Sequence, residues 1–162
     1  MPAKQPADAI ALLKADHRKV EGLFEKFEHA RDDNRKKALV QEICTELCVH
    51  TAIEEEIFYP ACKGEVEKDL LDEAYVEHDG AKALLAELIE GSPSDAFYDA
   101  KVSVLAEMIE HHVEEEEKRS EGLFAQAKAA GLAVDDLGVR MQTRKDRLTA
   151  EIRANGFPTL QT

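Results

Sequence analysis

Two histidine–glutamate pairs constrain this chain more strongly than any other feature of its sequence. His50 is followed four residues later by Glu54, and His112 is followed four residues later by Glu116. Residues four apart in an α-helix lie on the same face, about one turn from each other. Each pair therefore predicts a helix that presents an imidazole and a carboxylate together to the same neighbour.

Two further histidines show that the pairs belong to a repeated design. His17 precedes His50 by 33 residues (50 − 17), and His78 precedes His112 by 34 residues (112 − 78). An internal repeat of this length indicates that one supersecondary unit occurs twice. We expect two helical hairpins, each with one lone histidine and one histidine–glutamate pair.

Apolar residues recur every three or four positions along most of the chain, which is the period of an amphipathic helix. Charged residues make up 34% of the sequence, and Gly and Pro are few, which also favours helices. The spacing predicts helices over residues 7–30, 35–59, 65–90, 94–129 and 134–154. Pro60 is expected to end the second helix, and residues 92–95 (Ser-Pro-Ser-Asp) have the form of an N-terminal cap for the fourth.

The connections between the first four predicted helices are short, which favours antiparallel neighbours. We therefore expect an all-α protein, an up-down-up-down four-helix bundle over residues 1–130. Residues 131–162 would form an appended C-terminal helix that packs on the bundle or on a partner. This leaves a monomer and a homodimer both open.

The charge balance limits the expected partners. The formal net charge is −13, from 34 acidic and 21 basic side chains, so nucleic acid and an anionic membrane surface would be repelled at long range. The sequence has no apolar stretch long enough to span a bilayer and no signal-peptide core, which predicts a cytoplasmic protein. Three cysteines, Cys44, Cys48 and Cys62, make a disulfide framework an unlikely basis for the fold.

The repeated donors predict a metal site inside the bundle. The candidate ligands are His17, His50, Glu54, His78, His112 and Glu116. Imidazoles and carboxylates without a thiolate suit iron, manganese or zinc, and two carboxylates between two histidine clusters can bridge a pair of ions. Iron is the first choice. A bound cation also offsets the cost of burying six polar side chains.

Three details of this site stay open at the level of the residues. His111 and Glu115 have the same four-residue spacing as His112 and Glu116, and both pairs lie on apolar stripes. Tyr75, three residues before His78, could supply a phenolate ligand. Outer carboxylates that orient the imidazoles are also expected; the candidates are Asp16, Glu77 and the glutamates next to Glu54 and Glu116.

The ordered motifs resemble the hemerythrin-like, HHE cation-binding, family over about residues 8–125. They are Asp16-His17, residues 50–60 (HTAIEEEIFYP), Glu77-His78 and residues 111–117 (HHVEEEE). The resemblance implies that His17, His50, Glu54, His78, His112 and Glu116 bind two iron ions, as an oxo- or hydroxo-bridged pair, with zinc or manganese as less favoured occupants. It favours His112 over His111. Oxygen-carrying members have a second histidine where this chain has Ala74, which argues against reversible oxygen carriage with their full ligand set.

The resemblance implies a non-haem di-iron protein that binds, senses or reacts with dioxygen, nitric oxide or peroxide. A small diatomic molecule or peroxide is the expected partner. Whether the centre turns over as a peroxide- or oxygen-reducing enzyme stays open, and no catalytic residue is predicted. The alternative is iron buffering or storage, or a structural zinc bundle without redox turnover.

Overall fold

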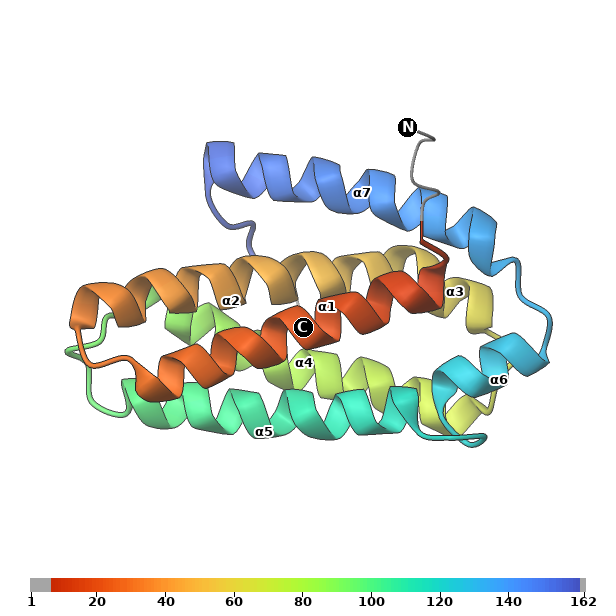
Figure 1. The fold of residues 1–162 in the computed structure, drawn as a ribbon, viewed down its shortest axis with the longest axis horizontal. Helices are drawn as coiled ribbons and strands as arrows, with labels where there is room; N and C mark the ends of the chain where they lie inside the picture. The colour runs from red at the N-terminus through yellow and green to blue at the C-terminus, as the bar shows by residue number, and fades with distance from the viewer. Residues whose placement is uncertain (1–6, 161–162) are drawn as a thin grey trace.

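The computed structural model describes residues 7–160, and all regular secondary structure in this range is helical (Figure 1). The helices are α1 (Ala9–His29), α2 (Asp33–Ile53), the π-helix η1 (Glu54–Phe58), α3 (Tyr59–Cys62), α4 (Lys68–Glu90), α5 (Tyr98–Glu117), α6 (Leu123–Ala129) and α7 (Val134–Asn155). Helices α1, α2, α4 and α5 form the expected four-helix bundle, in which α1 contacts α2, α2 contacts α4, α4 contacts α5 and α5 contacts α1.

Local sequence explains where the first helices begin. The Asp8 side chain accepts a hydrogen bond from the backbone N–H of Ala11, and the Asp32 side chain accepts one from Arg35, so both helices have an aspartate N-cap. Their apolar stripes are buried in one continuous core. Within residues 7–160, no helix combines the length and the apolar character needed to cross a membrane.

The end of the second bundle helix differs from the prediction. The helix does not stop at Tyr59 before Pro60, but passes through a π-helical turn and continues as α3 to Cys62. In this turn the N–H of Tyr59 donates to the carbonyl of Glu54, five residues back. A π turn inserts one extra residue, and such turns occur frequently at functional sites. Here it brings Tyr59 to the same side as Glu54.

The predicted continuous helix over residues 94–129 ends where expected, but it begins later than predicted and is interrupted at residues 118–122. Helix α5 begins at Tyr98, because Asp95 accepts a hydrogen bond from the N–H of Ser92 and closes a turn before the helix. The chain then leaves the helix after Glu117 and turns back at Gly122. A Cβ at Gly122 would lie only 2.6 Å from the carbonyl oxygen of Lys118, so glycine is required for this close turn. Helix α6 follows and lies across the end of the bundle (Figure 1).

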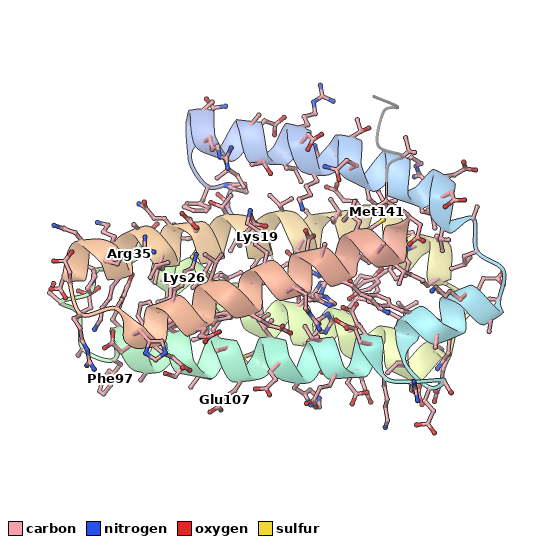
Figure 2. The ribbon with its side chains drawn as sticks, in the orientation of Figure 1. Lys19, Lys26, Arg35, Phe97, Glu107 and Met141 are labelled. Carbon is pink, nitrogen blue, oxygen red and sulfur yellow. The ribbon has the colours of Figure 1, made fainter. Side chains whose placement is uncertain are left out.

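Helix α7 lies along α1 and α2 on the outside of the bundle (Figure 1). A Cβ at Gly138 would be 2.4 Å from the carbonyl oxygen of Ala7, which shows how closely the two backbones approach. Met141 is completely buried and lies between α7 and the bundle (Figure 2). The C-terminal helix is therefore seated on its own bundle, with a register set by Gly138 and Met141.

Candidate metal centre

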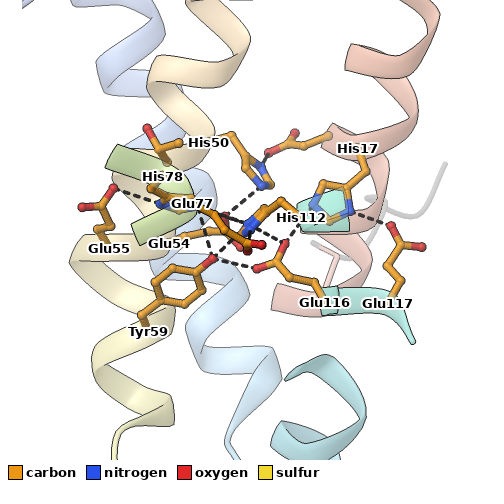
Figure 3. Close-up of polar contacts among 12 residues, drawn as sticks. His17, His50, Glu54, Glu55, Tyr59, Glu77, His78, His112, Glu116 and Glu117 are labelled. Atoms are coloured by element: carbon orange, nitrogen blue, oxygen red, sulfur yellow. Dashed lines mark hydrogen bonds and ion pairs between the residues drawn. The ribbon is translucent and has the colours of Figure 1, made fainter. Parts of the chain in front are cut away.

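All six side chains that the sequence nominated as ligands meet in the core of the bundle (Figure 3). Each is at most 5% exposed. They form two groups, one of His17, His50 and Glu116 and the other of Glu54, His78 and His112, and the donor atoms of each group lie within 4.8 Å of one another. Every bundle helix contributes to the centre, because the repeat places one histidine on each.

The two glutamates lie between the histidines. Glu54 Oε1 is 3.0 Å from His50 Nε2 and 3.1 Å from His78 Nε2. Glu116 Oε1 is 3.2 Å from His17 Nε2 and 3.3 Å from His112 Nε2. Each carboxylate therefore touches imidazoles from two helices, which is the placement expected of a group that bridges two ions.

A second layer of carboxylates orients all four imidazoles. Each histidine uses Nδ1 to hydrogen-bond a carboxylate of a different helix: Asp16 with His50 (2.9 Å), Glu55 with His78 (3.0 Å), Glu77 with His112 (2.8 Å) and Glu117 with His17 (2.6 Å). Asp16 thus supports His50, not the adjacent His17, and Glu77 supports His112, not the adjacent His78. The four pairs form a closed ring around the bundle, from α1 to α2, α4, α5 and back to α1.

This ring determines which nitrogen faces the centre. An Nδ1–H that donates to a carboxylate leaves the Nε2 lone pair of a neutral imidazole directed inward. His78 Nε2 and His112 Nε2 lie 3.2 Å apart, so two inward lone pairs would repel unless a proton or a metal cation lies between them. The residues therefore fit a cation by their chemistry as well as by their spacing.

Unpaired buried atoms support the same fit. Four atoms of the centre are buried without a hydrogen bond: Nε2 of His17, Nε2 of His50, Oε2 of Glu54 and Oε1 of Glu116. Although the His17 and Glu116 atoms are only 3.2 Å apart, they do not have hydrogen-bond geometry. Leaving such groups unpaired is costly, and metal coordination satisfies all four.

The carboxylates of the centre raise the pKa values of three of its imidazoles, those of His50, His78 and His112. Burial by itself would lower the pKa of His50, but the nearby carboxylates of Glu54 and Asp16 outweigh burial and raise it to about 10. The pKa values of His78 and His112 are raised in the same way against the effect of burial. Burial would raise the pKa of Glu54, but His50 and its neighbours hold it well below its usual value. Metal ions must therefore displace protons from these imidazoles.

The structure distinguishes the two adjacent histidines of α5. His112 is buried and contacts Glu54 and Glu116, whereas the His111 side chain is 63% exposed and reaches only the outer carboxylate of Glu77. Glu116 is buried while Glu115 is partly exposed. Both stripes contain apolar residues, so only the packing of α5 against the other helices separates them.

Sequence reasoning missed Tyr59, whose side chain is completely buried and points into the centre (Figure 3). Its hydroxyl donates to Glu116 Oε2 (2.8 Å) and lies 3.2 Å from Nε2 of both His78 and His112. Tyr75, the tyrosine considered from sequence, instead packs its ring edge-on against Tyr59. An ordinary helix would have turned Tyr59 away from Glu54, so only the π turn reveals its role.

Burial and the carboxylates of Glu116 and Glu54 raise the pKa of Tyr59 well above its ordinary value. The side chain is therefore a neutral phenol in the metal-free protein, and its O–H remains a hydrogen-bond donor. Ala74, one turn before His78, is buried and has no donor atom. The Tyr59 hydroxyl therefore supplies the polar group beside His78 that the side chain of Ala74 lacks.

The cysteines lie outside both donor groups. Cys44, Cys48 and Cys62 are buried free thiols. Burial raises the pKa of Cys62 to about 12 and that of Cys48 to about 11, so neither is an activated thiolate.

A four-helix bundle with histidines and carboxylates projecting inward from facing helices defines a class of bundle-core metal proteins. Residues 8–123 match the model of the hemerythrin HHE cation binding domain, and the chain belongs to this family. It is therefore a metal-binding helical protein, as the motifs predicted.

Two similar proteins extend the comparison. A protein named as a DNA nickase from Nostoc sp. (strain PCC 7120 / SAG 25.82 / UTEX 2576) is 29% identical over 114 residues, which are 70% of this chain and 32% of the relative. This chain thus spans about a third of that relative. A solved hemerythrin HHE cation binding domain-containing protein from Mycobacterium kansasii has the same fold, with a TM-score of 0.74 at 24% identity over 93% of this chain and 95% of that chain.

Proposed function

We propose that the centre binds two iron ions and that the protein binds or reacts with dioxygen, nitric oxide or peroxide. The observation that carries this proposal is the pair of adjacent donor groups, each of three residues, which together leave four buried polar atoms without a hydrogen bond. One group alone would hold one ion. Two groups that share bridging glutamates favour a pair.

The donor set favours iron over zinc. Imidazole and carboxylate ligands without thiolate suit Fe, Mn or Zn, but structural zinc sites are usually closed by four ligands, often including cysteine. Here each ion would be held by two imidazoles and the two shared glutamates, which are too few ligands to fill an octahedron, and the nearby thiols stay outside. Positions for an exogenous ligand therefore remain, and bound iron would supply exchange of electrons with a small oxidant.

A small apolar cavity beside the histidines limits the size of that ligand. It has a volume of about 20 Å³, compared with about 10–15 Å³ needed by one water on the same measure. All four histidines line it, together with the apolar side chains of Val20, Leu47, Ile109 and Val113. A weakly hydrated diatomic molecule fits this space, whereas a larger organic substrate does not.

The surrounding residues would orient the ligand and exclude water. Phe124 of α6 stacks on the His17 ring, with centroids 5.8 Å apart, and closes one end of the centre. The outer carboxylates hold each imidazole in one orientation. Tyr59 has its O–H beside both donor groups, so it is placed to donate a hydrogen bond or a proton to a bound ligand.

The experiment that tests this function measures metal and reactivity together. Full-length protein grown with ample iron is expected to contain about two irons per chain. The anaerobic ferrous protein should gain visible absorption on adding dioxygen, nitric oxide or hydrogen peroxide in separate samples. Iron buffering predicts variable iron content without a defined spectral response, and a structural zinc site predicts zinc with no response to any of the three. Either result would overturn the proposal.

Tyr59→Phe is expected to keep both irons but to slow the reaction of the ferrous protein with peroxide by roughly 100-fold, the usual effect of removing one donor from a reacting centre. The variant loses only the hydroxyl that contacts Glu116. Stopped-flow absorption measures the rate. Tyr75→Phe is the matched control, because that ring packs against Tyr59 and should react at the wild-type rate. Equal rates in Tyr59→Phe and wild type would contradict a role for the phenol.

DNA nicking, named for the Nostoc relative, is not part of this proposal. The chain matches only about a third of that protein. The net charge of −13 on the present chain also opposes its approach to a polyanion such as DNA.

A further inference from the structure

Each of the four outer carboxylates also contacts a basic side chain. Glu55 accepts from Lys82 (2.9 Å), Glu117 accepts from Arg18 (2.5 Å), Glu77 faces His111 (3.1 Å) and Asp16 accepts from Lys145. The chain of contacts is the same four times: a basic group, a carboxylate, an imidazole and the centre. A repeated arrangement of this kind shows that each imidazole is supported through a charged carboxylate.

Three of the four basic partners come from the bundle, and one does not. Lys82, Arg18 and His111 belong to the helices that carry the supported histidines, namely α4, α1 and α5. Helix α2 has no such group near His50, because its last lysine is Lys37, 13 residues earlier (50 − 37), or about 20 Å along the helix. The missing cation is Lys145 of α7.

Lys145 reaches Asp16 because α7 is seated in one register. It lies seven residues after Gly138, two helical turns along the same face. Next to it, Arg144 makes two hydrogen bonds to Glu56, at 2.8 and 3.2 Å. Glu56 belongs to the π-helix that carries Glu54 and Glu55. Helix α7 therefore contacts the supports of the centre at two points.

We propose that α7 is a functional part of the metal centre and that Lys145 is a positioning residue for His50. Lys145 contacts Oδ1 of Asp16 and holds this carboxylate in one orientation, and Asp16 in turn fixes the His50 ring through Nδ1. Asp16 is only 5% exposed, so without Lys145 it would be a buried anion with the imidazole as its partner.

The consequence is an asymmetry between the two donor groups. His50 belongs to the group with His17 and Glu116, whereas both histidines of the other group, His78 and His112, take their outer support from within the bundle. Losing Lys145 should weaken the ion of the first group more than that of the second. This inference rests on metal binding at the centre, but not on which small molecule reacts there. Lys145 and the whole of α7 lie outside the family match, which ends at residue 123.

The test is an anaerobic titration of the metal-free full chain with Co²⁺, followed by its visible absorption, with a chelator as competitor. Wild type is expected to bind two ions. Lys145→Met, which keeps the length and the apolar stem of the side chain, should weaken one of the two binding steps by about 10- to 100-fold and leave the other unchanged. Lys145→Arg should restore most of the lost affinity. Arg140→Gln removes one charge from an exposed position of the same helix and should leave both steps unchanged.

A double-mutant cycle shows whether Lys145 acts through Asp16. Asp16→Asn should weaken the same step, and the double variant Asp16→Asn/Lys145→Met should be no weaker than Asp16→Asn alone. Additive losses, or wild-type affinity in Lys145→Met, would overturn the inference. Melting curves of the metal-free variants identify a purely structural effect, which would weaken both steps equally. Lys145→Gln replaces Lys145→Met if the latter does not fold. A wild type that binds no Co²⁺ or Fe²⁺ would instead overturn the proposed function.

Discussion

His112→Ala is expected to reduce bound iron from about two ions per chain to fewer than one, whereas His111→Ala, which removes only the outer partner of Glu77, should keep most of the iron. His112 Nε2 lies close to donors of both groups, at 3.3 Å from Glu116 Oε1 and 3.7 Å from Glu54 Oε1. In the proposed centre, removing it would take a ligand from one ion and would leave Glu54 and Glu116 less well neutralised. His111 is exposed and reaches only Glu77.

Metal analysis of the two variants, expressed and loaded in parallel, measures this difference. The adjacent position makes His111→Ala a close control, because both variants lose one imidazole from the same turn of α5. Equal iron content in the two variants would show that the inward position of His112 does not correspond to metal binding. Loss of iron from His111→Ala alone would assign the metal ligands of α5 to His111 and Glu115 instead.

The metal-free protein is expected to lose stability as the pH rises from 6.5 to 8.5. The pKa of His50 is raised from 6.5 to about 10 in the folded state. A raised histidine pKa contributes stability that is fully present below the unfolded value of 6.5 and is lost as the pH approaches 10. Between these values the folded state binds one more proton than the unfolded state, which costs about 1.4 kcal/mol per pH unit.

The carboxylates act at the other end of the pH scale. The pKa values of Glu54 and Asp16 are lowered, so their contribution is present above their ordinary values of 4.5 and 3.8 and is lost only as the pH falls below these. Buried Cys62, with a pKa near 12 against an ordinary 9.0, reduces stability further above pH 9. The interval from pH 6.5 to 8.5 therefore isolates the histidines.

Thermal melts at pH 6.5, 7.5 and 8.5, with and without Zn²⁺ as a redox-inert probe, test this expectation. Without metal, the Tm should fall by roughly 3–6 °C per pH unit from His50 alone. With Zn²⁺ the protein should be stabilised more strongly at higher pH, because the metal no longer competes with protons for the imidazoles. A metal-free Tm that is constant or rises over this range would contradict the raised pKa of His50.

Much of the architecture was predictable from local sequence. Apolar periodicity located the four bundle helices, and short connections predicted their antiparallel order. The interruptions were not predictable in the same way. Gly122 lies in a segment with helical spacing, and a single glycine costs a helix only about 1 kcal/mol, so the pattern does not show that α5 ends before it, at Glu117. The break allows α6 to fold across the end of the bundle, where the Phe124 ring stacks on the His17 ring.

The sequence by itself determined four of the six buried donors, His17, His50, Glu54 and His78, and left His112 and Glu116 open against His111 and Glu115. Residues four apart share a helix face, and a buried polar set repeated at equal spacing requires a common partner. Only the tertiary structure decided how these donors are completed. Asp16 hydrogen-bonds His50 and accepts a hydrogen bond from Lys145, although the three residues are far apart in the chain. Tyr59 enters because a π turn shifts it by one position. Apolar periodicity shows which residues share a face of one helix. The remaining contacts of a histidine–glutamate centre form between helices, and they depend on how the helices pack.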